Sequence, residues 1–225
     1  MPTLKIATVK DLKTVPTVEN GEKLVSLKLV APAVMAKYIK LDMVPLYGED
    51  IIVRETVAKK LATAQGELSL INHHWQFLVV YGYRSPAVQQ KYYAERQKEL
   101  LSREVPAERL EEETHKLVAV PEVAGHPTGG AIDITIIDQK DGIEIDMGGH
   151  IADFSNLERI PTHSPSISSG QLKNRLLLHD LLTKVGFAPF YGEWWHYSYG
   201  DKEWAFFYDK LNAIYNQIEY EKETS

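Results

Sequence analysis

The sequence predicts an α+β fold in which a mostly antiparallel sheet carries the functional site and helices pack against that sheet. Two observations predict the strands: residues 130–137 alternate between apolar and other side chains, and residues 76–83 form a continuous apolar stretch. A third observation predicts the helices, because residues 53–68 and 171–185 carry apolar side chains at helical spacing. No internal repeat or linker interrupts the 225 residues, so we expect the whole chain, residues 1–225, to form a single domain.

The composition narrows the class of protein. With 44% hydrophobic and 25% charged residues the chain is an ordinary globular protein, and its net charge of −6 argues against a nucleic-acid partner, which requires a basic surface. The chain has no cysteine, so any metal must be held by His, Asp or Glu. No stretch has the length of a signal peptide or a membrane span. We therefore expect a cytoplasmic protein, or a periplasmic one if a signal peptide has been removed.

The N-terminal third begins with polar, mixed residues 1–24, which predict an extended lead-in. Residues 24–30 alternate as a strand does, whereas residues 32–47 fit either a helical stripe or loop packing. The helix over 53–68 follows Glu49 and Asp50, whose charges suit a helix N-terminus. Its predicted apolar face comprises Val53, Val57, Leu61, Ala64 and Leu68.

The middle third starts with the buried strand over 76–83, which ends in Arg84-Ser85-Pro86. Proline favours the first turn of a helix, so a helix is predicted over about residues 87–103. A second helical segment follows Pro106, and its high charge is typical of a solvated face.

Beyond the strand over 130–137, Asp141-Gly142 predicts a hairpin turn. Residues 148–170 are rich in Ser, Pro and Gly, and so long a connection without secondary structure is often a functional loop.

The C-terminal third is predicted to contain a helix over 171–185 that ends at Gly186. The side chains expected to point inward are Leu172, Leu176, Leu182 and Val185. Residues 187–199 are rich in aromatic side chains and favour β structure, and residues 204–220 fit an amphipathic terminal helix.

The first candidate site joins His126 and Asp133. Side chains alternate along a strand, so Asp133 lies on the face opposite to the isoleucines of residues 132–136. Gly129 and Gly130 permit a turn that brings His126 back over Asp133, and the two side chains together can supply two ligands to one metal. The alternative is an ordinary loop histidine and a carboxylate on a solvated strand face.

The second candidate site is Glu193 and His196, with Trp194 and Trp195 between them. Catalytic zinc keeps three protein ligands and an open position. His196 completes that number with His126 and Asp133, and Glu193 is left to take a proton from water. Residues three apart in a regular strand point to opposite faces, so a shared site requires a bulge or a strand that ends between them. A salt-bridged Glu193 and a packed His196 are the alternative.

The third candidate is Arg84, at the end of a strand and before a helix. Its guanidinium donors can stabilise the oxyanion of a tetrahedral intermediate, although in isolation a surface arginine is the favoured interpretation. The other histidines are expected to be structural or solvated: His73, His74, His115, His150, His163 and His179.

Three motifs occur in a characteristic order: Tyr83-Arg84-Ser85-Pro86, then the segment from His126 to Asp133, then Glu193-Trp194-Trp195-His196. This order resembles the zinc D-alanyl-D-alanine metallopeptidases, and most of all their D-alanyl-D-alanine dipeptidase branch. The matching positions in the second motif are His126, Gly129, Ala131 and Asp133. The resemblance extends over about residues 53–199.

The resemblance implies one Zn²⁺ per chain, held by His126, Asp133 and His196. It also implies that Glu193 acts as general base and later as acid, and that Arg84 stabilises the transition state. An acidic residue, here Asp153, is implied to lie near the free amino group of the substrate. The implied substrate is D-alanyl-D-alanine or a similar small D,D-dipeptide.

The chain also departs from the family pattern. Ala124 stands where the family has a serine that helps to hold substrate, so dipeptide specificity stays open. Ser85 separates Arg84 from Pro86, and the charged segment over 95–113 has no assigned role.

Two alternatives remain besides a dipeptidase. One is a D,D-carboxypeptidase or endopeptidase of the same fold acting on cell-wall peptides. The other is a zinc-binding recognition module without catalysis, which would need neither Glu193 nor Arg84. The oligomeric state and the physiological role stay open.

Overall fold

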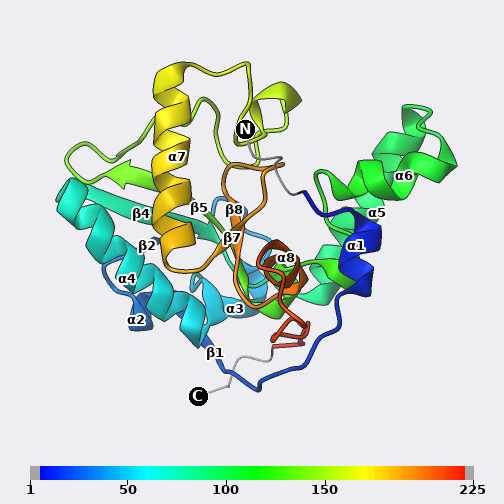
Figure 1. Cartoon of the computed structure of the whole chain (residues 1–225), viewed down its shortest axis with the longest axis horizontal. Helices are drawn as coiled ribbons and strands as arrows, with labels where there is room; N and C mark the ends of the chain where they lie inside the picture. The colour runs from blue at the N-terminus through cyan, green and yellow to red at the C-terminus, as the bar shows by residue number, and fades with distance from the viewer. Residues whose placement is uncertain (1–5, 221–225) are drawn as a thin grey trace.

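Strand β5 (Ala131–Asp138) is the centre of a six-stranded sheet in the computed structural model, which describes residues 6–220 (Figure 1). The strand order is β2-β4-β5-β8-β7, and β6 pairs with the far end of β5. All of these pairs are antiparallel except β2 with β4, as the predicted fold class requires. The other strands of this sheet are β2 (Met35–Ala36), β4 (Trp75–Tyr81), β6 (Ile143–Glu144), β7 (Ala188–Pro189) and β8 (His196–Ser198).

A second, two-stranded sheet pairs β1 (Leu24–Ser26) with β3 (Ile52–Arg54). The strand predicted over 24–30 is wrong beyond Ser26, because the chain turns into the short helix α2 (Leu27–Val30). The amide of Ala31 donates to the carbonyl of Leu27, whose side chain is buried in the core. The ambiguous segment 32–47 forms β2 and the single helical turn α3 (Val44–Tyr47).

Helices α4 (Glu55–Ile71) and α7 (Ser169–Lys184) pack against each other (Figure 1). The apolar side chains of α4 join the isoleucines of β5 in one hydrophobic cluster. The helix predicted over 53–68 begins two residues later, because Val53 and Arg54 belong to β3, and the acid in its first turn is Glu55 rather than Glu49 or Asp50. The predicted inward face of α7 is partly wrong, since its fully buried leucines are Leu178, Leu181 and Leu182.

Helices α5 (Pro86–Ser102) and α6 (Ala107–His115) contact each other beside the sheet, and α6 also contacts α1 (Val9–Thr14) (Figure 1). The two predicted helices are confirmed, but α1 overturns part of the extended lead-in predicted for residues 1–24, of which 1–5 lie outside the described residues. Thr8 and Asp11 cap α1, and Val9 and Leu12 are buried beneath it. The charged residues of α6 are not all solvated, because Glu112 accepts a hydrogen bond from the amide of Val9.

The predicted terminal helix over 204–220 is wrong beyond Phe207, where α8 (Lys202–Phe207) ends. Ala213 and Tyr215 are buried by returning to the N-terminal segment, where Thr17 forms a bridge with Ala213. The amphipathic pattern of residues 204–220 therefore does not reflect one helix, because its apolar residues are buried in α8 and in the segment that pairs with Thr17. Within residues 6–220, no helix combines the length and the apolar character that crossing a membrane requires.

Candidate metal centre and active site

Asp133 and His196 are direct partners on adjacent antiparallel strands. Asp133 lies on β5 opposite His196, the first residue of β8. Directly opposed residues in an antiparallel pair present their side chains on the same face of the sheet. On its other side Asp133 is paired with Tyr81 of β4, so the three side chains form a row across the sheet.

His126 reaches this row from a short 3₁₀ turn, His126–Thr128, that precedes β5. The turn ends at Gly129, whose φ of +73° is favourable only for glycine. A Cβ at this position would also lie 2.3 Å from Cδ2 of Leu24. The turn predicted at Gly129 is thus confirmed, and it places the His126 ring beside Asp133.

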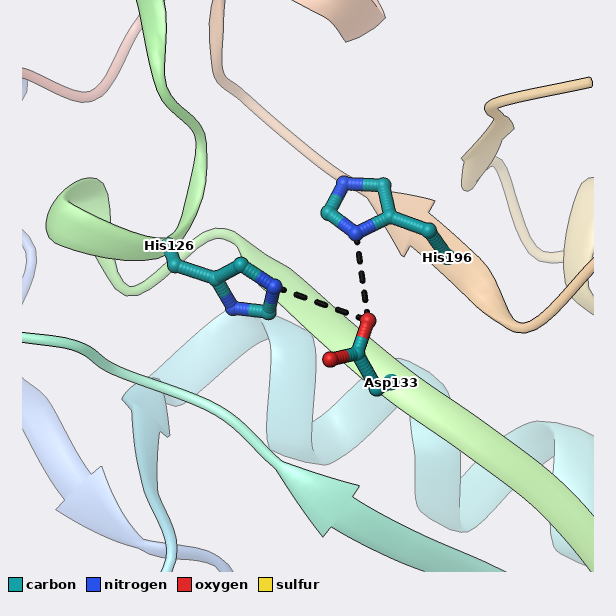
Figure 2. Close-up of side chains that lie close together, drawn as sticks. All are labelled: His126, Asp133 and His196. Carbon is teal, nitrogen blue, oxygen red and sulfur yellow. Dashed lines mark hydrogen bonds and ion pairs between the residues drawn. The ribbon is translucent and has the colours of Figure 1, made fainter. Parts of the chain in front are cut away.

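The three side chains meet at one carboxylate oxygen (Figure 2). Oδ1 of Asp133 lies 3.5 Å from Nε2 of His126 and 3.2 Å from Nδ1 of His196. A tetrahedral zinc ion with bonds of about 2.0–2.1 Å spaces its ligand atoms about 3.3–3.4 Å apart. The spacing and the nitrogen and oxygen donors therefore fit a divalent ion of this kind, and the three residues form a candidate metal centre.

The imidazole rings of His126 and His196 are each oriented by an outer partner, a group on the side of the ring that faces away from Asp133. Nδ1 of His126 donates to the carbonyl of Gly82 at 2.8 Å, which leaves the lone pair of Nε2 directed at Asp133. On the far side of His196, Nε2 lies 3.6 Å from Oε2 of Glu203, so Nδ1 is the nitrogen available to a metal. Carboxylates and carbonyls behind metal-binding histidines fix the ring orientation in this way.

The charges of the metal-free centre are strongly coupled. Burial lowers the pKa of His126 to about 4, so this ring is neutral at pH 7. Burial by itself would lower the pKa of His196, but Asp133, Glu203 and Glu193 outweigh it and raise this pKa to about 9. Burial would likewise raise the pKa of Asp133, yet His126 and His196 hold it far below its ordinary range. A metal ion binding here would displace the proton of His196.

Glu193 shares the cavity with the three candidate ligands. The strand β8 begins only at His196, and Glu193 lies in the turn before it, which removes the conflict between opposite strand faces. Burial, together with the charges of Asp133 and Glu203, raises the pKa of Glu193 to about 8. The neighbouring Trp194 and Trp195 are buried, and Trp195 also lines the cavity.

Arg84 also lines the cavity, as predicted for an arginine at the end of a strand. Its guanidinium lies over the rings of Tyr81 and Tyr92, and Nη1 donates to Oε1 of Gln89 at 2.8 Å. Nε of Arg84 is buried without an acceptor among residues 6–220. The guanidinium is therefore held in place while Nε still lacks an acceptor. Ser85, which interrupts the family pattern, caps α5 by accepting a hydrogen bond from the amide of Val88.

Asp42 supports this arrangement, and no sequence pattern pointed to it. Its Oδ2 accepts hydrogen bonds from the hydroxyl groups of both Tyr81 and Tyr92. Asp42 lies in the segment that sequence patterns left ambiguous, so neither its neighbours nor its distance from Arg84 was predictable. Glu203 was missed for a similar reason, since nothing in its local sequence distinguishes it from a surface acid.

The cavity has a volume of about 410 Å³, and the long loop predicted over 148–170 forms one of its walls through Ala152, Phe154 and Leu157. The buried Arg175 of α7 holds this loop by donating to the backbone carbonyls of Arg159 and Pro161 within it and of Met147 just before it. Asp153 is exposed and not among the lining residues, and its Oδ1 accepts from the amide of Ser155 at 2.9 Å. Its contact with substrate therefore stays a prediction. Ala124, the departure from the family pattern, lines the cavity.

Replacing Glu203 by glutamine is expected to lower the affinity for the metal about 10- to 100-fold, the usual cost of losing the partner behind a metal-binding histidine. The amide keeps the size of the side chain but removes the negative charge that faces Nε2 of His196. Competition with a chromophoric chelator measures the effect. Glu122→Gln is the matched control, because its side chain is 74% exposed. Equal affinity in both variants would separate Glu203 from the metal centre.

Two histidines and an aspartate around one point, with a buried carboxyl and an arginine in the same cavity, define the site of a metal-dependent hydrolase. A protein family described as D-Ala-D-Ala dipeptidase matches residues 30–218 of this sequence. The chain therefore belongs to the D-Ala-D-Ala dipeptidase family and is a metallopeptidase.

Individual relatives agree with this family. The chain is 31% identical over 193 residues to a D-alanyl-D-alanine dipeptidase of Synechocystis, covering 75% of this chain and 77% of the relative. It is 38% identical over 76 residues to a D-alanyl-D-alanine dipeptidase of Escherichia coli, or 33% of this chain and 37% of the relative. A zinc-bound mutant of the vancomycin-resistance D,D-pentapeptidase VanY is 18% identical, with a TM-score of 0.42 over 66% of this chain and 73% of that chain.

Proposed function

We propose that this protein is a zinc-dependent dipeptidase that hydrolyses D-alanyl-D-alanine or a similar small D,D-dipeptide. The observation that carries the proposal is the convergence of His126, Asp133 and His196 in the cavity that also holds Glu193 and Arg84. Two imidazoles and one carboxylate are a usual ligand set for catalytic zinc. Membership of the D-Ala-D-Ala dipeptidase family supports the choice of substrate.

The proposed mechanism assigns a task to each group in the cavity. Zinc held by the three ligands would lower the pKa of a water molecule and polarise the scissile carbonyl. The carboxylate of Glu193 accepts a proton from the attacking water and later returns it to the nitrogen of the leaving amine. A carboxyl group with a pKa raised by burial is suited to hold that proton between the two transfers.

Arg84 stabilises negative charge in the transition state and takes no part in proton transfer. The carbonyl oxygen of the scissile bond gains negative charge in the transition state, and the donors of a fixed guanidinium stabilise it there. Stacking on Tyr81 and Tyr92 and the hydrogen bond to Gln89 hold Arg84 in position before substrate binds. Asp153 is proposed to attract the free amino group at the rim of the cavity, next to Phe154 in the cavity wall.

The direct test is zinc content and release of D-alanine from D-alanyl-D-alanine by the purified protein. We expect one zinc per chain and hydrolysis of the D,D-dipeptide but not of L-alanyl-L-alanine. Removal of the metal with a chelator should abolish the reaction, and added zinc should restore it. A stoichiometric zinc protein with no D-alanine release would contradict the proposed substrate.

A second candidate, a D,D-carboxypeptidase of longer peptides, is favoured by one observation. The cavity continues along α5 past the metal centre to Glu99 and Arg103, farther than a dipeptide needs. Comparing kcat/KM for D-alanyl-D-alanine and L-lysyl-D-alanyl-D-alanine decides between the two functions. Preference for the tripeptide would establish the carboxypeptidase.

A further inference from the structure

Two cations face one aromatic ring in the cavity. Nζ of Lys40 lies 5.1 Å from the ring centroid of Tyr92, and Cζ of Arg84 lies 5.2 Å from the same centroid. Lys40 is also 5.9 Å from the ring centroid of Phe154 in the cavity wall. That ring in turn packs edge-on against Trp195, two residues from Glu193. Lys40 therefore projects into the same chamber as the candidate metal centre.

The two cations differ in their partners. Arg84 donates to Gln89, whereas Lys40 makes no hydrogen bond or ion pair with any residue between positions 6 and 220. The nearby Asp42 accepts hydrogen bonds from Tyr81 and Tyr92 instead. Burial, followed by the charge of Arg84, lowers the pKa of Lys40, and the charges of Asp133, Asp42 and Glu193 only partly oppose this shift. A half-buried ammonium group without a directly bonded anion is costly, and an anion supplied by a ligand would remove that cost.

We propose that Lys40 binds the C-terminal carboxylate of the substrate and so selects peptides with a free C-terminus. The inference rests on the proposed peptidase function and adds a specificity-determining residue to it. A dipeptide carries one carboxylate and one ammonium group. Lys40 and Arg84 line the cavity and attract the carboxylate, whereas the ammonium group is directed to Asp153 at the exposed rim. A lysine ammonium binds such a group as a compact point charge.

The test compares D-alanyl-D-alanine with its C-terminal amide, which differs only in the charge that Lys40 is proposed to read. A hydrogen bond to a charged group corresponds to a preference of about 10- to 100-fold in kcat/KM for the acid over the amide. We expect this ratio in the wild-type enzyme, a ratio near one in Lys40→Met, and a largely restored ratio in Lys40→Arg. Lys37→Met, an exposed lysine of the same segment, is the matched control and should keep the wild-type ratio. An unchanged ratio in Lys40→Met overturns the proposal.

Binding measured without turnover separates this proposal from the proposed function. Calorimetry on zinc-loaded Glu193→Gln, with and without Lys40→Met, gives the Kd of the acid and of the amide. A preference for the acid that disappears with Lys40 supports the carboxylate contact even if the wild type hydrolyses neither compound, in which case only the proposed reaction is wrong. Equal Kd values for acid and amide in the Glu193→Gln background overturn the role of Lys40. The melting temperature of each variant checks that the fold is intact.

Discussion

Glu193→Gln is expected to keep its full complement of zinc and to lose about 10²- to 10⁴-fold in kcat for D-alanyl-D-alanine, the usual contribution of a positioned general base. Glu193 lies outside the set of three ligands, so the metal centre does not need it. The amide has nearly the same size as the carboxyl group but cannot accept a proton. Elemental analysis and steady-state kinetics on the same preparation measure both effects, and Glu193→Ala should behave in the same way.

The matched variant is Glu203→Gln, which makes the same chemical change on the other side of His196. It should weaken metal binding and recover activity when zinc is in excess, whereas excess zinc should not rescue Glu193→Gln. If Glu193→Ala were fully active, the base would have to be another group in the cavity.

His126→Ala and His196→Ala are each expected to lose stoichiometric zinc and, with it, all measurable hydrolysis. Each substitution leaves a nitrogen and an oxygen donor where three ligands stood. The loss of affinity should exceed the 10- to 100-fold expected for an outer partner such as Glu203. Zinc content after dialysis and titration against a chelator measure it for both variants.

His163→Ala is the control for these two variants. His163 belongs to the long loop, packs beside Tyr191 and does not line the cavity. It should retain zinc and activity. Loss of zinc from His126→Ala but not from His196→Ala would contradict a three-ligand centre and would leave His196 as a packed aromatic neighbour of Phe190.

The sequence was most informative where local rules decide the geometry. The alternation of residues 130–137 and the glycine after Thr128 indicated that His126 can lie over Asp133, with an ordinary loop histidine as the alternative, and the structure brings the two side chains together. The requirement that the strand end between Glu193 and His196 also followed from alternation, and β8 does begin at His196. These features depend on residues that are near in the chain.

Features that depend on distant partners were missed. Helix α1 forms because its apolar side chains are buried against distant elements, and the irregular path after Phe207 forms because Ala213 pairs with Thr17. The local sequence of each segment fitted a different conformation. Lys40 and Asp42 reach Arg84 only because β2 pairs in parallel with β4, a crossover that their own segment does not signal. Outer partners such as Glu203 carry no spacing rule, since many positions in a fold can reach the back of an imidazole.

The pairing of β5 with β8 has a consequence for folding. His126 and Asp133 are close in the chain, but His196 joins them only when β8 docks on β5. An unfolded chain therefore lacks the complete ligand set, and the proposed zinc ion would stabilise the folded state by mass action, by about 2.7 kcal/mol at a free concentration 100 times Kd. A metal bound at this centre would link segments that are far apart in the chain, so we expect the melting temperature of this enzyme to rise with the concentration of zinc.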